Sequence, residues 1–90
     1  MALHVNEAGT IVRPPRQLTT TTGNDYWELI VNFGEKKRED WYVRVWKTSY
    51  SDLMDCLDID VEIQVEGKIT KWQKGEGYGV VIDAEVVNLV

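Results

Sequence analysis

The chain has 90 residues, 43% of them hydrophobic, and a formal net charge of −5. A chain of this length is expected to form one domain over residues 1–90, and it contains no run of about 18 apolar residues that could cross a membrane. The first residues lack the basic and apolar regions of a secretory signal, and one cysteine, Cys56, cannot form an internal disulfide. We therefore expect a cytoplasmic protein in which Cys56 is a buried, inert thiol.

The negative charge is concentrated in one region of the sequence. Residues 52–66 hold six acids and no base, whereas the other segments together hold ten bases and nine acids. The six acids are Asp52, Asp55, Asp58, Asp60, Glu62 and Glu66. A nucleic-acid partner is therefore not excluded by the net charge, but its path should avoid this region.

The first half of the chain predicts two strands. Residues 3–12 form an apolar segment interrupted by Gly9, which predicts a strand with a bulge or bend at the glycine. The proline pair at 14–15 should end that strand, because proline cannot donate a backbone hydrogen bond. Residues 26–33 alternate, and the uniformly apolar set that includes Trp27 should face the core.

A third strand is predicted over residues 41–48. Trp41 shares the parity of the valines and is assigned to the core. The other face carries two rings and a cation, from Tyr42, Arg44 and Trp46. A short helix over 49–57 should follow, capped by Ser49 or Ser51.

The last part of the chain predicts a pair of strands. Residues 61–70 alternate and are followed by a hairpin tip at 71–77, with a bulge at Gly67. Residues 78–90 are apolar enough to close a barrel. The fold class is therefore all-β, and the element order predicts a five-stranded OB-fold barrel with one short helix between strands 3 and 4.

The chain resembles the DNA-binding domain of bacterial-type single-stranded-DNA-binding proteins. Four stretches carry the resemblance, namely GTIVRPP at 9–15, WELIVNF at 27–33, DWYVRVW at 40–46 and VEIQVEGKITKWQ at 61–73. The resemblance implies an OB-fold, self-association into homodimers or homotetramers, and sequence-tolerant binding of single-stranded DNA in replication, recombination or repair.

Three features depart from the family pattern, and one of them is the unusual acidity of the helix region. Residues 58–60 read Asp-Ile-Asp where the family usually has a Lys-Gly turn. The sequence given ends at Val90 without the acidic, proline-containing tail that recruits replication proteins in the family, so we do not expect that recruitment.

The candidate DNA-binding residues combine rings that stack on bases with cations that contact phosphates. The strongest set surrounds the last hairpin, where three lysines flank one tryptophan. The full set is Trp72, Trp46, Tyr42, Arg44, Lys68, Lys71, Lys74, Arg13, Arg16 and Tyr78. Trp41, assigned to the core by parity, stands beside Asp40 and resembles a stacking position of the family, which is the alternative for that residue. The bases at 36–38 lie among acids and are assigned to a solvated loop.

Catalysis finds little support in the sequence. His4 is the one histidine, and neither a metal site nor a triad is evident around it, so we expect no enzyme, metal or cofactor. Two alternatives to DNA remain open. An OB-fold module that binds another protein would explain the acidic region, and an RNA strand would use the same stacking and phosphate contacts.

Overall fold

The computed structural model describes residues 3–34, 40–46, 50–74 and 77–90, and within them all side chains except those of residues 3 and 71–79. The elements are β1 (Leu3–Thr19), β2 (Asp25–Asn32), β3 (Asp40–Val45), α1 (Ser51–Cys56), β4 (Glu62–Lys74) and β5 (Gly77–Leu89). No helix in this part of the chain is long and apolar enough to cross a membrane.

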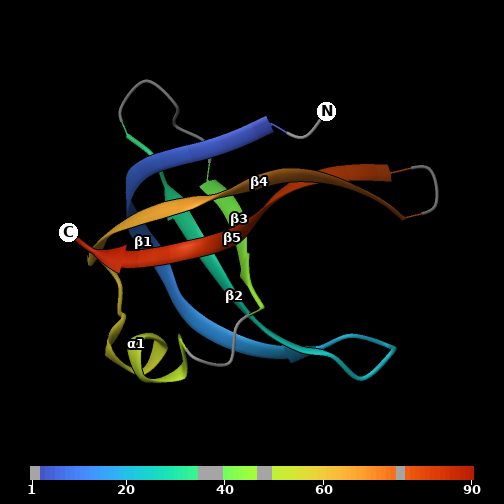
Figure 1. Ribbon diagram of the computed structural model, residues 1–90, viewed down its shortest axis with the longest axis horizontal. Helices are drawn as coiled ribbons and strands as arrows, with labels where there is room; N and C mark the ends of the chain where they lie inside the picture. Colours follow the sequence, from blue (N-terminus) through green and yellow to red (C-terminus); the bar gives the residue numbers. More distant parts are fainter. Residues whose placement is uncertain (1–2, 35–39, 47–49, 75–76) are drawn as a thin grey trace.

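The five strands close into a barrel in the order β1-β2-β3-β5-β4 (Figure 1). β3 and β5 pair in parallel, and the other neighbours are antiparallel. The helix α1 covers one end of the barrel, and the long β1 curves so that it pairs with both β2 and β4. This architecture confirms the predicted OB-fold.

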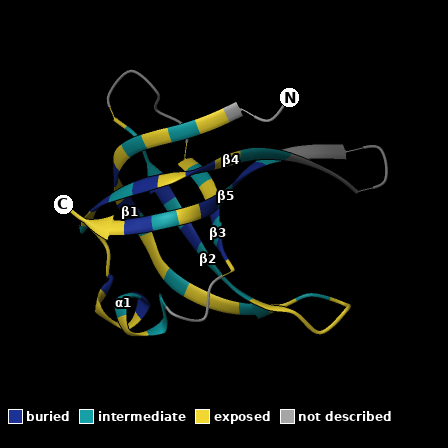
Figure 2. Ribbon diagram, in the orientation of Figure 1, coloured by how far each residue is buried: buried dark blue, intermediate teal, exposed yellow. Residues whose placement is uncertain are grey.

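The core is built from one face of each strand, as the alternation predicts. Buried and more accessible residues alternate along the strands in Figure 2. The fully buried side chains are Ile11, Leu29, Val31, Val43, Val45, Ile63, Val65, Ile82 and Val87. Trp27 and Trp41 are partly buried against this cluster, so their assignment to the core is confirmed.

The prediction that the proline pair ends the first strand is wrong. β1 continues through Pro14 and Pro15 to Thr19, with a register shift against β2 between Arg13 and Arg16. A shift of this kind places the prolines at a bulge, where no ladder hydrogen bond from their nitrogens is required.

Gly9 does not mark a bulge, because its pairing with β4 is regular on both sides. A Cβ atom at this position would lie 2.6 Å from Val31 and 2.8 Å from Phe33. The glycine is therefore explained by the close approach of β2.

The helix differs from its prediction in two respects. Its N-terminal flanking residue is Tyr50, and no side chain caps the helix there; Ser51 is its first residue and Ser49 lies outside the described residues. Cys56 is exposed, so the prediction of a buried thiol is wrong. Met54 and Leu57 lie three positions apart and face the core, which turns Cys56 toward solvent.

The last hairpin is longer than predicted. β4 extends to Lys74 and β5 begins at Gly77, so most of the expected tip at 71–77 is paired strand. The predicted bulge is confirmed beside Gly67, where the register shifts. Gly67 pairs with Ala84 and its neighbour Glu66 with Val86, which leaves Glu85 as the extra residue.

Gly67→Ala should destabilise the barrel strongly. The added Cβ would lie 2.2 Å from the backbone oxygen of Asp83, so β5 would have to move. We expect the free energy of unfolding to fall by about 1–3 kcal/mol, measured by urea titration of tryptophan fluorescence. The control, Asn88→Ala, changes an exposed strand residue and should have an effect within about 0.5 kcal/mol. Equal effects of the two variants would contradict this account.

Candidate nucleic-acid interface

The outer face of β3 carries the predicted aromatic and basic residues. Val43 and Val45 are buried, so the alternate residues Tyr42 and Arg44 project away from the barrel. Tyr42 is 49% exposed, and Trp46, just beyond the end of β3, is 37% exposed. Both rings therefore retain accessible surface that a base could contact.

Asp83, on the neighbouring strand β5, connects this face. Its carboxylate accepts hydrogen bonds from Arg44 Nε at 2.8 Å and Arg44 Nη2 at 3.2 Å. It also accepts from Trp46 Nε1 at 3.1 Å and from Thr70 Oγ1 at 2.6 Å. One carboxylate thus links β5 to residues of β3, of β4 and of the segment that follows β3.

The indole of Trp46 is held on three sides. Its N–H donates to Asp83, and its ring lies 4.7 Å from the ring of Tyr26, measured between centroids. The Arg44 guanidinium carbon lies 5.2 Å from the indole centroid, within cation–π range. The orientation of Trp46 is therefore fixed by side chains, because the paired part of β3 ends at Val45.

The outer face also carries a row of alternating charges. Cross-strand pairing places five charged residues on successive strands around the barrel, in the order Arg16, Glu28, Arg44, Asp83 and Lys68. We call these five residues the charged row. Because adjacent members have opposite charge, the row neutralises much of its own field.

Each base in the charged row has a carboxylate within ion-pair distance. Arg16 lies 3.0 Å from Glu28, and Arg44 lies 2.8 Å from Asp83. Lys68 lies 3.6 Å from Glu85, the extra residue of the bulge. Three of the predicted phosphate-binding side chains are therefore already paired within the protein.

The remaining predicted residues fall into two groups. Arg13 is exposed on β1 and has no ion pair among the described residues. The side chains of the others lie outside the described residues; these are Lys71, Trp72, Lys74 and Tyr78. Backbone register places Trp72 opposite Gly79 and Lys74 opposite Gly77 in the β4–β5 hairpin. The bases at 36–38 also lie outside the description.

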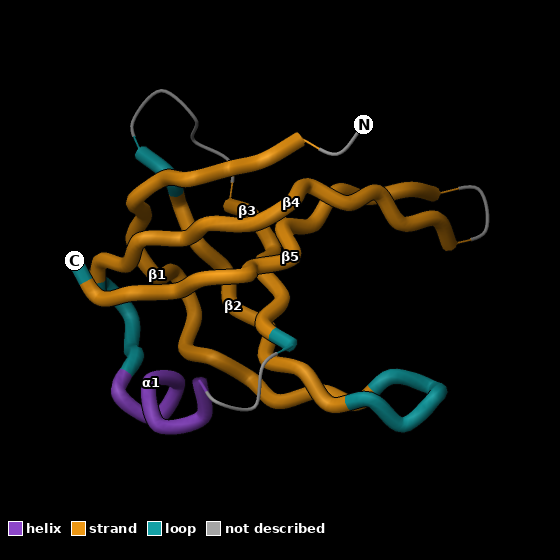
Figure 3. Tube along the Cα trace, in the orientation of Figure 1, coloured by secondary structure: helices purple, strands orange, loops and turns teal. Residues whose placement is uncertain are grey.

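Two hairpins extend from the same side of the barrel. The β1–β2 turn and the β4–β5 arm both project to the right in Figures 1 and 3. OB-folds bind oligonucleotides on the face of strands 2 and 3, between the loops that join strands 1–2 and strands 4–5. The exposed rings of Tyr42, on β3, and of Trp46, just after it, therefore belong to the face on which this fold binds nucleic acids.

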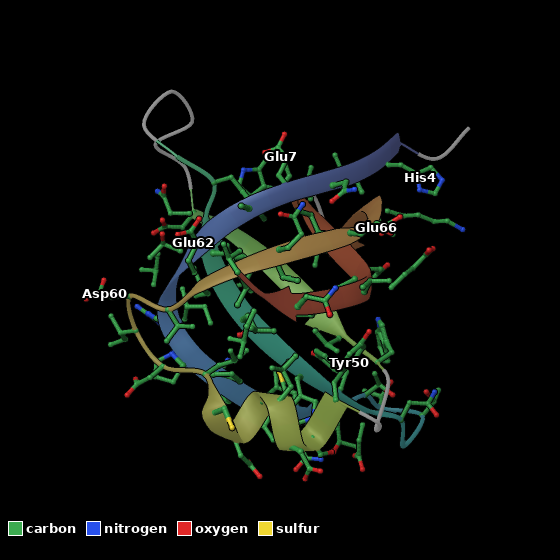
Figure 4. All side chains as sticks on the ribbon, turned by 60° about the vertical axis from the view of Figure 1, so that its left-hand side comes forward. His4, Glu7, Tyr50, Asp60, Glu62 and Glu66 are labelled. Carbon is green, nitrogen blue, oxygen red and sulfur yellow. The ribbon has the colours of Figure 1, made fainter. Side chains whose placement is uncertain are left out.

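Most of the acidic region precedes β4 or lies at its start, and Glu66 alone reaches the charged row, two residues from Lys68. All six acids of residues 52–66 are exposed, and Figure 4 shows Asp60, Glu62 and Glu66 in succession before and along β4. Within the described ranges, no three His, Cys, Asp or Glu side chains form a metal-ligating group. A polyanion would be repelled from this side and would meet less repulsion across the charged row.

Sequence reasoning missed three residues of this interface. Tyr26 and Glu28 lie on the outer parity of the second strand, and Asp83 is an acid within an otherwise apolar run. The parity of Glu28 could have been matched with Arg44 across the hairpin. The contact of Asp83 could not, because β3 and β5 are brought together by the closure of the barrel.

No protein-family model and no curated protein matches the sequence. Solved structures do match the fold. Rim1, a mitochondrial single-stranded DNA binding protein from S. cerevisiae, aligns with a TM-score of 0.83 at 14% identity, covering 100% of this chain and 97% of Rim1. The small single-stranded DNA-binding protein from Streptomyces coelicolor gives 0.74 at 12% identity, with 99% and 93% covered.

An SSB domain from Synechococcus sp. aligns with a TM-score of 0.70 at 16% identity, covering 96% of this chain and 91% of that one. The chain thus has the OB-fold of single-stranded DNA-binding proteins over nearly its whole length. This confirms the resemblance found in the sequence at the level of the fold.

The Asp83 contacts should make stability depend on acid pH. Burial raises the pKa of Asp83, but hydrogen bonds from Arg44, Thr70 and Trp46, with the Arg44 charge, outweigh it and lower the pKa overall. Stability from Asp83 is therefore present above the unfolded pKa, about 3.9, and is lost as pH falls through the lower folded pKa.

Asp83→Asn should cost about 1–3 kcal/mol of unfolding free energy at pH 7, because charged acceptors are lost. It should also show a smaller further loss than the wild type below about pH 4. Urea titrations across pH 2–7, with the exposed Asp55→Asn as control, measure both effects. Parallel pH profiles for the wild type and Asp83→Asn would refute this role.

Proposed function

We propose that this protein binds single-stranded DNA with little sequence preference and does not catalyse a reaction. The observation that carries the proposal is the pair of exposed rings, Tyr42 and Trp46, on the oligonucleotide-binding face of an OB barrel. The three structural neighbours described above are single-stranded DNA-binding proteins, which supports the proposal.

Stacking and charge neutralisation would share the binding energy. A base stacked on an aromatic ring contributes about 1–3 kcal/mol, and every base offers a π-face, so binding tolerates sequence changes. Phosphates would be contacted by the basic residues Arg13 on β1 and Lys71 and Lys74 of the β4–β5 hairpin. These contacts would release condensed counterions from the DNA. Roles in replication, recombination or repair in the cytoplasm would follow from such binding.

Titration with oligo-dT, followed by tryptophan fluorescence, tests the proposal. Quenching at micromolar protein in low salt, weakening as salt rises, is the expected result. Trp46→Ala should weaken binding about 5- to 140-fold, the equivalent of one lost stacking contact, and Trp72→Ala should weaken it comparably. Absence of quenching in low salt would refute the proposed function.

Trp27→Phe is the matched control, because Trp27 packs against the core. It should lower the unfolding free energy and leave the oligo-dT affinity within about two-fold. A matched RNA oligonucleotide in competition shows whether the 2′-hydroxyl changes the affinity.

A second candidate function is binding of a protein with a basic surface. It is favoured by the exposure of all six acids in residues 52–66, with Ile59 among them at 53% exposure. This function predicts a salt-sensitive protein complex together with weak or no oligo-dT quenching, so the same titration separates the two candidates.

We further propose that the chain associates into homodimers or homotetramers. Exposed apolar side chains such as Ile59 and Leu89, at 53% and 55% exposure, would gain from burial between subunits. Light scattering over a range of concentrations should give a mass of two or four chains. A monomeric mass at the highest concentration would refute this proposal.

A further inference from the structure

The two shortest ion pairs of the charged row, Arg44–Asp83 and Arg16–Glu28, differ in how they could respond to a phosphate. Arg44 and Asp83 are both about three-quarters buried, and Asp83 also accepts from Trp46 and Thr70. Releasing Arg44 to a phosphate would break a four-bond network that orients Trp46. Arg44 is therefore fixed in place, and it acts by positioning the indole.

The Arg16–Glu28 pair has the opposite character. It consists of one contact of 3.0 Å, in which the Arg16 side chain is 68% exposed and the Glu28 side chain is 20% exposed. Because solvent screens the Arg16 end, the contact should shift an equilibrium by about five-fold or less, so a phosphate that approaches from solvent can take the place of Glu28 on Arg16. Arg16 can therefore exchange its partner, whereas Arg44 cannot.

We infer that Glu28 is an intramolecular competitor of the DNA phosphate for Arg16 and so limits the affinity of this face. The inference rests on the proposed function. In the free protein the Glu28 carboxylate accepts a hydrogen bond from Nη2 of Arg16, a donor that a phosphate oxygen would compete for. Glu28 also lies opposite Arg44 in the β2–β3 ladder, so it stays on the binding face after Arg16 leaves it.

The competition between Glu28 and phosphate should change how the DNA affinity depends on salt concentration. When Arg16 moves to a phosphate, the strand releases about 0.7 of a counterion, but the unpaired Glu28 carboxylate attracts a cation from solution. The two effects partly cancel. Removing the Glu28 charge should therefore both tighten binding and steepen the dependence of affinity on salt.

The test compares Glu28→Gln with Glu62→Gln by oligo-dT titration at four or more salt concentrations. The two variants change the net charge equally, and both glutamines match glutamate in shape. Glu62 is exposed at the start of β4, six residues or about 20 Å along that strand from Lys68, and it pairs with Thr10 (Figure 4). It is therefore a control for net charge away from the charged row.

Glu28→Gln should bind oligo-dT about two- to five-fold more tightly than Glu62→Gln at low salt. Its slope of log affinity against log salt should be steeper by up to about 0.7. In an Arg16→Gln background, the added Glu28→Gln change should lose this advantage, because the competition acts through Arg16. Equal affinities and slopes for the two single variants would overturn the inference.

The experiment distinguishes failure of the proposed function from failure of the inference about Glu28. If the wild type fails to bind oligo-dT, the proposed function and this inference both fall. If the wild type binds and Glu28→Gln matches Glu62→Gln, the proposed function stands and this inference alone is wrong. Should Glu28→Gln prove unstable, Glu28→Thr removes the same charge with a strand-favouring side chain and must give the same result.

Discussion

The parallel contact between β3 and β5 is the constraint on which the barrel and its outer face both depend. It extends over Tyr42–Val45 and Val81–Ala84, and it joins segments that are distant in the sequence. Inside, valines and Ile82 pack across it; outside, Asp83 binds Arg44 and Trp46. The contact that closes the barrel therefore also sets the orientation of the exposed indole.

Much of the fold could be predicted from the sequence because its evidence is local. Alternating residues identified the strands, and a helix between the third and fourth of them indicated the OB-fold. The incorrect predictions concern residues whose local structure depends on contacts with strands distant in the sequence. Pro14 and Pro15 are accommodated by a register shift against β2. Gly9 is required because Val31 approaches it too closely for a Cβ atom. Neither partner is visible from the neighbouring residues.

For the candidate site, too, the sequence predicted what depends on neighbouring residues and missed what depends on other strands. Outer-face parity correctly placed Tyr42, Arg44 and Trp46 away from the core. Composition could not reveal that Arg16, Arg44 and Lys68 are paired with acids, because those acids lie on other strands. Counting bases therefore overstates the positive charge that a strand of DNA would meet, because the three basic residues of the charged row are balanced by Glu28, Asp83 and Glu85.

The bulge beside Gly67 shows how such a face can change without disturbing the interior. Glu85 is the supernumerary residue of β5; on either side of it, Ala84 stays opposite Gly67 and Val87 stays opposite Val65. The carboxylate that meets Lys68 is thus carried by an extra residue of the ladder and does not stand in place of another paired side chain. Deletion of Glu85 would remove the bulge and leave the pairing of the buried residues unchanged. The surface charge at this place can therefore change independently of the core.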